Sequence, residues 1–358
     1  MSSELHFGDL SVSIFGESHG AGIGAVINGL PSGITLDMDK ILEFMARRAP
    51  KKDGVSTTRN EKDAPEIISG FYNGKTTGTP LAAIIRNTDQ HSSDYKNIST
   101  AARPGHADYT GFMRYSGAND PRGGGHFSGR LTAPLVFAGA VCAQILESRG
   151  IHSCAHVLAA GGVYDDRFNE LDIPLSLMET VKKRSFPVIN EETEPLMKEK
   201  IKKASENLDS VGGLIECAVA GLPAGIGDPV FDGLENRISQ AVFGIPAVKG
   251  VEFGKGFEFA DMYGSSANDE MYMDNGIVRT KTNNNGGICG GISDGMPVIF
   301  TVAVKTTPSI ARPQQTVDFK RGTDTELTIK GRHDACIVPR AVACVEAAAD
   351  IAILSYFI

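Results

Sequence analysis

An alternation of apolar and polar side chains opens the chain. Leu10, Val12 and Ile14 are apolar, and the serines between them are polar. A period of two is typical of a β-strand with one buried face, so this pattern predicts a strand. Short apolar runs bounded by turn residues predict further strands at residues 66–71, 81–86, 213–220 and 297–304.

A helical period follows between residues 38 and 49. Asp37 can cap the start of this helix, and Pro50 ends it. Its apolar side chains fall on one face at helical spacing: Ile41, Leu42, Phe44 and Met45. Similar reasoning predicts helices at about residues 107–115, 128–150, 192–207 and 339–355.

The order of these elements indicates the fold class. The final helix is almost wholly apolar, so we expect it to be buried, and Pro339 suits its first turn. Strands and helices mix without a strict βαβ rhythm, which predicts an α+β fold or a layered α/β arrangement. No linker or repeat divides the sequence, so we expect one domain over residues 1–358.

Composition then narrows the classes of function. Hydrophobic residues make up 41% and charged residues 22% of the chain, as in folded globular proteins. With 35 basic and 43 acidic residues the net charge is −8, which argues against a general nucleic-acid binder. The stretch from Leu131 to Leu146 is too short to span a bilayer and contains Gln144, so we expect a buried helix and no membrane partner.

The cysteines and the first residues point to the cytoplasm. None of the six cysteines forms a C-x-x-C pair, and most lie in apolar runs, which predicts buried reduced thiols. Glu4, His6 and Asp9 near the start predict no signal peptide. No metal-binding motif is present in the sequence, so we expect no metal site.

Five polar, glycine-rich segments lie at the ends of the predicted elements: residues 15–24, 47–59, 103–108, 120–130 and 331–334. In the first segment, His19 is either accessible to a ligand or an ordinary histidine in a turn. The second is either an anion site or a solvated helix end. The glycines before Ser128 expose backbone amides that can bind an anion. In the last segment, Asp334 either caps the final helix or accepts a proton.

Basic and histidine residues gather in these segments although the net charge is negative. They are Arg103, His106, Arg122, His126, Arg130, Arg332 and His333. Folded into one pocket, they would bind a small, highly anionic ligand, since arginine pairs well with carboxylates and phosphates. His19 and His106 can then protonate the ligand, and Asp334 can accept a proton.

These segments, in this order, resemble the motifs of the chorismate synthase family. The matching motifs are Gly16–Gly20, Arg103–Asp108, Arg122–Gly125 with Ser128–Ala133, and Gly331–Cys336. Three positions depart from the family pattern. Ala335 replaces a proline, residues 51–54 lack an arginine that many members have, and His126 stands at a variable position.

The resemblance implies a lyase of aromatic amino acid biosynthesis. The family converts 5-enolpyruvylshikimate 3-phosphate to chorismate and phosphate by an anti-1,4-elimination. It uses reduced FMN without net redox change. The resemblance also implies a homotetramer and a layered sandwich of sheets around a helical core.

The same resemblance implies roles for individual residues. His19 protonates the departing phosphate, His106 keeps the flavin protonated, and Asp334 relays a proton from the flavin. The expected FMN contacts are His126, Phe127, Ser128, Ala247, Gly290, Lys305, Thr306, Thr307, Pro308, Ser309 and Arg332. The expected substrate contacts are Arg47, Arg48, Arg103 and Arg130.

Two other classes of protein fit such a pocket. A flavin-dependent oxidoreductase would need a nicotinamide site, and the sequence has no G-x-G-x-x-G between a strand and a helix. A non-catalytic anion-binding protein would not need two histidines and an aspartate beside the arginines. Because no residues are left over for a flavin reductase domain, we expect the electrons for FMN to come from outside, although intrinsic use of NADPH stays open.

Overall fold

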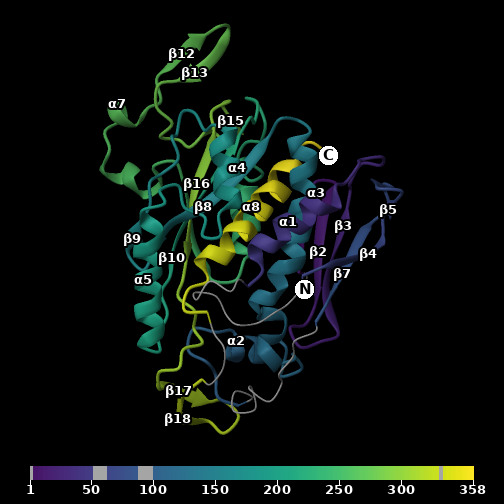
Figure 1. Cartoon of the computed structure of the whole chain (residues 1–358), viewed down its shortest axis with the longest axis vertical. Coiled ribbons are helices and arrows are strands. Elements are labelled where there is room, and N and C mark those ends of the chain that lie inside the picture. Colours follow the sequence, from purple (N-terminus) through teal and green to yellow (C-terminus); the bar gives the residue numbers. More distant parts are fainter. Residues whose placement is uncertain (1–2, 51–62, 88–99, 330–333) are drawn as a thin grey trace.

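Two five-stranded sheets frame the protein (Figure 1). The computed structural model describes residues 3–50, 63–87, 100–329 and 334–358. The first sheet contains, in spatial order, β1 (Glu4–Phe7), β2 (Leu10–Gly16), β3 (Gly22–Asn28), β7 (Leu81–Arg86) and β4 (Pro65–Ser69). The second contains β11 (Val248–Phe253), β16 (Val298–Val304), β10 (Gly213–Ala220), β8 (His152–Ala160) and β9 (Val163–Tyr164). All neighbouring strands in both sheets are antiparallel.

Helices fill the layer between the sheets. They are α1 (Met38–Arg48), α3 (Thr132–Glu147), α6 (Leu234–Phe243) and α8 (Val338–Leu354). Helix α8 packs on α3, on α6 and on β8, while α3 also packs on β3 of the first sheet (Figure 1). Helices α4 (Leu175–Lys183) and α5 (Thr193–Glu206) cover the other face of the second sheet. The fold is therefore α+β, a sheet–helix–sheet sandwich.

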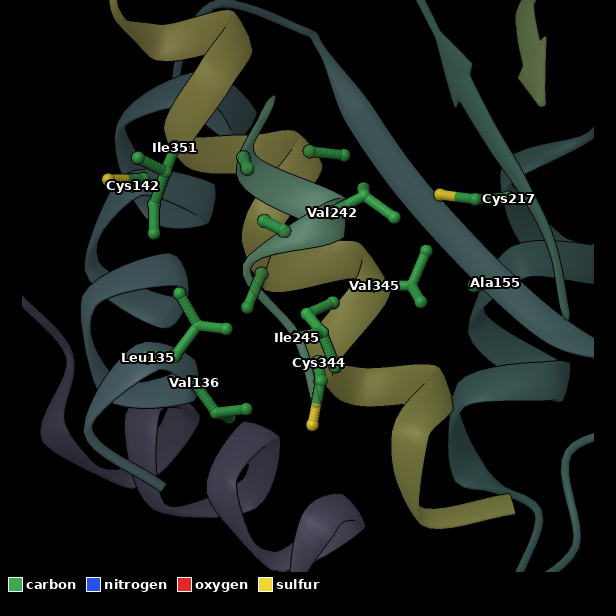
Figure 2. Close-up of a cluster of buried hydrophobic side chains, with 14 of the residues drawn as sticks. Leu135, Val136, Cys142, Ala155, Cys217, Val242, Ile245, Cys344, Val345 and Ile351 are labelled. Carbon is green, nitrogen blue, oxygen red and sulfur yellow. The ribbon is translucent and has the colours of Figure 1, made fainter. Parts of the chain in front are cut away.

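The core is built on a close approach of α3 and α8. A Cβ atom added to Gly139 of α3 would lie 2.2 Å from the Cβ of Ala347 of α8, so only glycine fits there. Figure 2 shows Leu135 and Val136 on α3 and Val345 on α8 within the same apolar cluster. Residues Gly129–Glu147 are long and apolar enough to cross a membrane, but 89% of the apolar window is buried inside the protein, as a core helix is.

The predicted helices were confirmed where the sequence has a capping residue or a clear apolar period. Helix α1 begins after Asp37, whose carboxylate accepts hydrogen bonds from the amides of Asp39 and Lys40 at 3.0 and 3.2 Å. Helices α2 (Asp108–Arg114), α5 and α8 lie within a residue or two of their predicted bounds. The helix predicted at 128–150 is shorter at both ends. Ser128 caps a single 3₁₀ turn at Gly129–Leu131, and α3 begins only at Thr132.

Strand predictions held for β2, β4, β7, β10 and β16. Strand β3 was not predicted. Buried and partly exposed residues alternate along most of it, but its two glycines interrupt the matching alternation of apolar and polar residues in the sequence. Five of the six cysteines are buried as expected, and none forms a disulfide. Cys289 is exposed, so the prediction is wrong for that residue: it lies in β14, a two-residue strand in a short hairpin rather than in a core element.

Short hairpins and helices complete the chain. The hairpin strands are β5 (Phe71–Tyr72), β6 (Lys75–Thr76), β12 (Met271–Asp274), β13 (Ile277–Thr280), β14 (Ile288–Cys289), β15 (Ile292–Ser293), β17 (Gln314–Asp318) and β18 (Thr323–Leu327). Helix α7 (Gly264–Ala267) and the 3₁₀ segments Arg122–Phe127 and Gly256–Asp261 lie in the connections.

Candidate active site

A cavity of about 820 Å³ opens where three core helices end. The last residue of α1 and the first turns of α3 and α8 line it, and in Figure 1 these helix ends face the side of the molecule that carries α2. The loops at residues 103–107, 123–131 and 305–309 close its other walls. The described parts of four predicted glycine-rich segments, 47–50, 103–108, 120–130 and Asp334, therefore converge, whereas no residue of the segment 15–24 lines the cavity.

Two guanidinium groups share one carboxylate at the wall formed by α1 and α3. Arg48 donates from Nη1 to Oδ2 of Asp63 at 2.6 Å, and Nη1 of Arg130 donates to the other carboxylate oxygen. Arg48 also donates to the hydroxyl of Thr132 at 3.0 Å. Burial raises the pKa of Asp63, but the two adjacent arginines outweigh it and hold the pKa below its ordinary value. Asp63 is therefore an anion that orients both arginines.

His106 belongs to a second arginine–carboxylate pair. Arg103 donates to Asp108 through its backbone amide and two side-chain nitrogens, at 2.7–2.9 Å. Nδ1 of His106 lies 2.9 Å from Oδ1 of Asp108. Burial raises the pKa of Asp108, but the hydrogen bonds from Arg103 and His106 hold it well below its ordinary value. Nη2 of Arg103 lies 3.0 Å from the same nitrogen, so Nδ1 faces both the guanidinium and the carboxylate of this pair.

Asp334 lies four residues before α8 begins at Val338, and it pairs with Arg340 of that helix. Nη1 of Arg340 donates to Oδ2 of Asp334 at 2.5 Å, and both residues line the cavity. The alternative in which Asp334 caps α8 is wrong: the cap position is Ile337, and no side chain of the described residues caps this helix. Arg332 and His333 lie outside the described residues, as does the basic loop at 51–59.

His19 is buried beside the turn that follows Arg122. The His19 side chain is close enough to Gly123, a cavity-lining residue, that a Cβ at this glycine would overlap its ring. Arg122 itself does not line the cavity. It makes an ion pair with Asp120 and is half exposed, so the prediction that it joins the anion pocket is wrong.

The charges that line the cavity are mostly positive. The cationic side chains among the lining residues are Arg48, Arg103, Arg130, Lys249, Lys305 and Arg340, against the carboxylates of Glu4 and Asp334. The whole chain has a net charge of −8. A positive cavity in an acidic protein favours a ligand with several negative charges, as the sequence predicted.

Comparisons with known proteins identify one family. The family model for chorismate synthase matches residues 10–358. The chorismate synthase of Korarchaeum cryptofilum is 45% identical over 97% of this chain and 95% of its own. That of Pyrococcus abyssi is 45% identical over 94% of this chain and 92% of its own.

This chain belongs to the chorismate synthase family. A solved structure described as the crystal structure of chorismate synthase superposes with a TM-score of 0.77 at 29% identity, covering 98% of this chain and 92% of the other. Chorismate synthases are lyases, so the chain is an enzyme of that type.

Most residues that the resemblance to chorismate synthase assigned to FMN lie together in the cavity. They are His126, Phe127, Ser128, Ala247, Lys305, Thr307, Pro308 and Ser309. Thr306 lies between two of these residues but is exposed and does not line the cavity. Gly290 does not line it either: it turns the β14–β15 hairpin, where the next residue, Gly291, lies against Asp228 and Gly233.

Arg47 is also not brought to the cavity. Its two terminal nitrogens each donate to the carboxylate of Glu346 at 2.5 Å, and the Glu346 side chain is fully buried. This ion pair joins α1 to α8, and neither of its residues lines the cavity. The prediction that Arg47 contacts substrate is therefore replaced by a structural role.

The sequence analysis missed two residues that line the cavity, Lys249 and Arg340, and two carboxylates that bind its arginines, Asp63 and Asp108. Asp108 was within a quoted motif, and its spacing of two from His106 was an available signal. Nothing in the sequence near Asp63 separates it from other surface aspartates, because its role depends on two arginines that are distant along the chain.

Proposed function

We propose that this enzyme converts 5-enolpyruvylshikimate 3-phosphate to chorismate and phosphate with reduced FMN bound in the cavity. The observation that carries the proposal is the excess of arginine and lysine around a cavity in which His106 and Asp334 also lie. A substrate with two carboxylates and a phosphate needs such an excess. Arg48, Arg103, Arg130 and Arg340 are the proposed anion-binding residues.

The cavity residues fit FMN. Oγ1 of Thr307 is buried and makes no hydrogen bond to any described residue, so a donor or acceptor on a ligand would satisfy it. Burial and the nearby Lys249 lower the pKa of Lys305. An anion such as a phosphate bound beside Lys305 would stabilise its charged form. Phe127, Leu135 and Ile337 add an apolar wall suited to a flat ring.

We propose that Lys305, Thr307 and Ser309 hold FMN, with Phe127 against its ring. Reduced flavin supplies electron density that assists the loss of phosphate and is recovered at the end of the reaction. His19 would give a proton to the leaving phosphate oxygen. His106 would hold a proton at Nε2, the nitrogen that Asp108 does not bind. Asp334 would accept a proton on its carboxylate, which Arg340 orients.

The assembly and location are also proposals. We infer that residues 1–358 form one unit without a flavin reductase, because one apolar core runs from Ile23 of the first sheet to Phe300 of the second. The resemblance supports a homotetramer in the cytoplasm.

One assay tests the function. Phosphate release is measured with photoreduced FMN, without FMN, and with NADPH plus oxidised FMN. We expect release with reduced FMN and none without it. NADPH oxidation without phosphate release would instead favour the flavin oxidoreductase, and ligand binding with neither reaction would favour an anion-binding protein.

Substitutions then test the roles of the histidines. His19→Ala and His106→Ala should each lower turnover by roughly a hundredfold to ten-thousandfold, the range for lost acid–base groups. His152→Ala is the matched control, because His152 begins β8 and does not line the cavity. Turnover at the wild-type rate in either of the first two variants would remove that histidine from the mechanism.

A further inference from the structure

The turn at residues 123–125 lies beside both proposed proton-transfer histidines. Gly123 and Gly124 have φ angles of 60° and 86°, in the left-handed region that favours glycine. Gly123 lines the cavity, and Gly124 contacts His106, whose side chain lines it. Their backbone conformation alone would require glycine at both positions. Whether they also position the histidines depends on their contacts.

The missing side chain of Gly123 is replaced by the ring of His19. A Cβ atom at Gly123 would lie 2.0 Å from both Cε1 and Nδ1 of His19, closer than any real contact. The imidazole therefore occupies the space that any side chain at residue 123 would need. Because Gly123 lines the cavity, this contact sets how His19 lies relative to the cavity wall.

Gly124 has the same relationship with His106. A Cβ atom at Gly124 would lie 3.2 Å from Cε1 and 3.3 Å from Nε2 of His106. The edge of the ring that carries Nε2 therefore rests on Gly124, while Nδ1 on the other edge faces Asp108. Adjacent residues of one turn thus contact the two histidines, which come from segments 87 positions apart in the sequence.

We propose that Gly123 and Gly124 are positioning residues, and that this turn holds both imidazoles in the arrangement needed for proton transfer. The inference rests on the proposed roles of His19 and His106. It predicts that a methyl group at residue 123 displaces the His19 ring rather than the backbone, because the atoms it meets are the end of a side chain that can rotate. Activity would be lost while the fold stays intact.

Gly123→Ala and Gly8→Ala form a matched pair. Gly8 has φ of 57°, almost the same as Gly123, but a Cβ there would meet nothing within 4 Å. Both alanines must adopt the same left-handed backbone conformation, so their melting temperatures should fall by similar amounts. We expect kcat to fall about a hundredfold in Gly123→Ala, as for a misplaced catalytic group, and to stay at the wild-type value in Gly8→Ala.

A double variant tests whether Gly123 acts through His19. If it does, Gly123→Ala combined with His19→Ala turns over at the rate of His19→Ala alone, because the displaced ring is already absent. A further loss in the double variant, or equal kcat in Gly123→Ala and Gly8→Ala, would overturn the proposal while His19→Ala still supports the function. Wild-type turnover in His19→Ala would overturn both.

Gly124→Ala keeps the proposal testable if Gly123→Ala does not fold. Its contact is looser, so His106 needs to shift by only a few tenths of an ångström. We expect kcat to fall about tenfold, with no further loss in the His106→Ala background. A kcat at the wild-type value in Gly124→Ala would contradict the role of this turn in seating His106.

Discussion

Nδ1 of His106 lies 2.9 Å from Oδ1 of Asp108. The carboxylate is itself fixed by Arg103, which donates to both of its oxygens. This arrangement holds the imidazole ring and leaves Nε2 as the nitrogen that faces away from the pair. Asp108 does not line the cavity. Its loss should therefore change how the His106 ring is held without removing a group that touches the ligand.

Asp108→Asn tests this relationship. An amide cannot be the charged acceptor that His106 and Arg103 share, so we expect kcat to fall by at least about tenfold while FMN affinity is kept. Nitrogen-15 NMR of the histidines should show changed chemical shifts for the ring nitrogens of His106, because the carboxylate beside Nδ1 is gone. Asp232→Asn is the control, since it breaks a similar pair with Arg237 and neither residue lines the cavity. Unchanged chemical shifts for His106 would contradict a role of Asp108 in holding this ring.

Asp334→Asn separates proton transfer from packing. The amide oxygen can still accept the hydrogen bond from Arg340, but it cannot take up a proton. We expect turnover to fall by at least about a hundredfold, with substrate and FMN still bound and the melting temperature lowered no more than in Asp232→Asn. Phosphate release at the wild-type rate would leave Asp334 with the single task of orienting Arg340.

Arg47→Met should affect stability and not catalysis. The substitution leaves the carboxylate of Glu346, whose side chain is fully buried, without its cation. Breaking such a pair costs roughly 3–5 kcal/mol of unfolding free energy. Urea unfolding measures this loss, and the KM for substrate should be unchanged. Adding Glu346→Gln should recover part of the stability, because the amide still accepts from the backbone of Ala155. A raised KM in stable protein would return Arg47 to the substrate site.

Asp350 predicts a pH dependence of stability. Burial raises the pKa of Asp350 to about 8, with Glu346 and Glu147 adding to the rise, and Lys182 and Ser153 opposing it. The folded state therefore holds a proton that the unfolded state loses at its ordinary pKa of about 3.9. The unfolding free energy contributed by this group falls as pH rises between these two values, by at most about 1.4 kcal/mol per unit.

The variant Asp350→Asn should remove this dependence. Its unfolding free energy relative to the wild type should rise between pH 5 and pH 8, as measured by urea unfolding at the two pH values. Asp39→Asn, on the exposed first turn of α1, is the control. A constant difference between Asp350→Asn and the wild type would mean that Asp350 is ionised in the folded protein.

Local signals along the chain predicted much of the fold. Asp37, the apolar face of Ile41 and Met45, and Pro50 together defined α1, because capping and periodicity act within a few residues. The motif residues of the chorismate synthase family predicted Arg103, His106, Arg130 and Asp334 at the cavity wall. Strand β3 and the start of α3 were missed, since glycine-rich segments carry little periodicity and the pairing partners are far away in sequence.

Arg47 and Arg48 mark the boundary between what the sequence determined and what only the tertiary structure decided. The sequence determined that two adjacent arginines end α1, where cations are favourable. Neighbouring residues on a helix point about 100° apart, so these two side chains face different surroundings. Packing of α1 against α8 directs Arg47 to Glu346 in the core, and Arg48 to Asp63 at the cavity. The partner that each charge finds depends on residues about 300 and 15 positions away, and only folding brings these together.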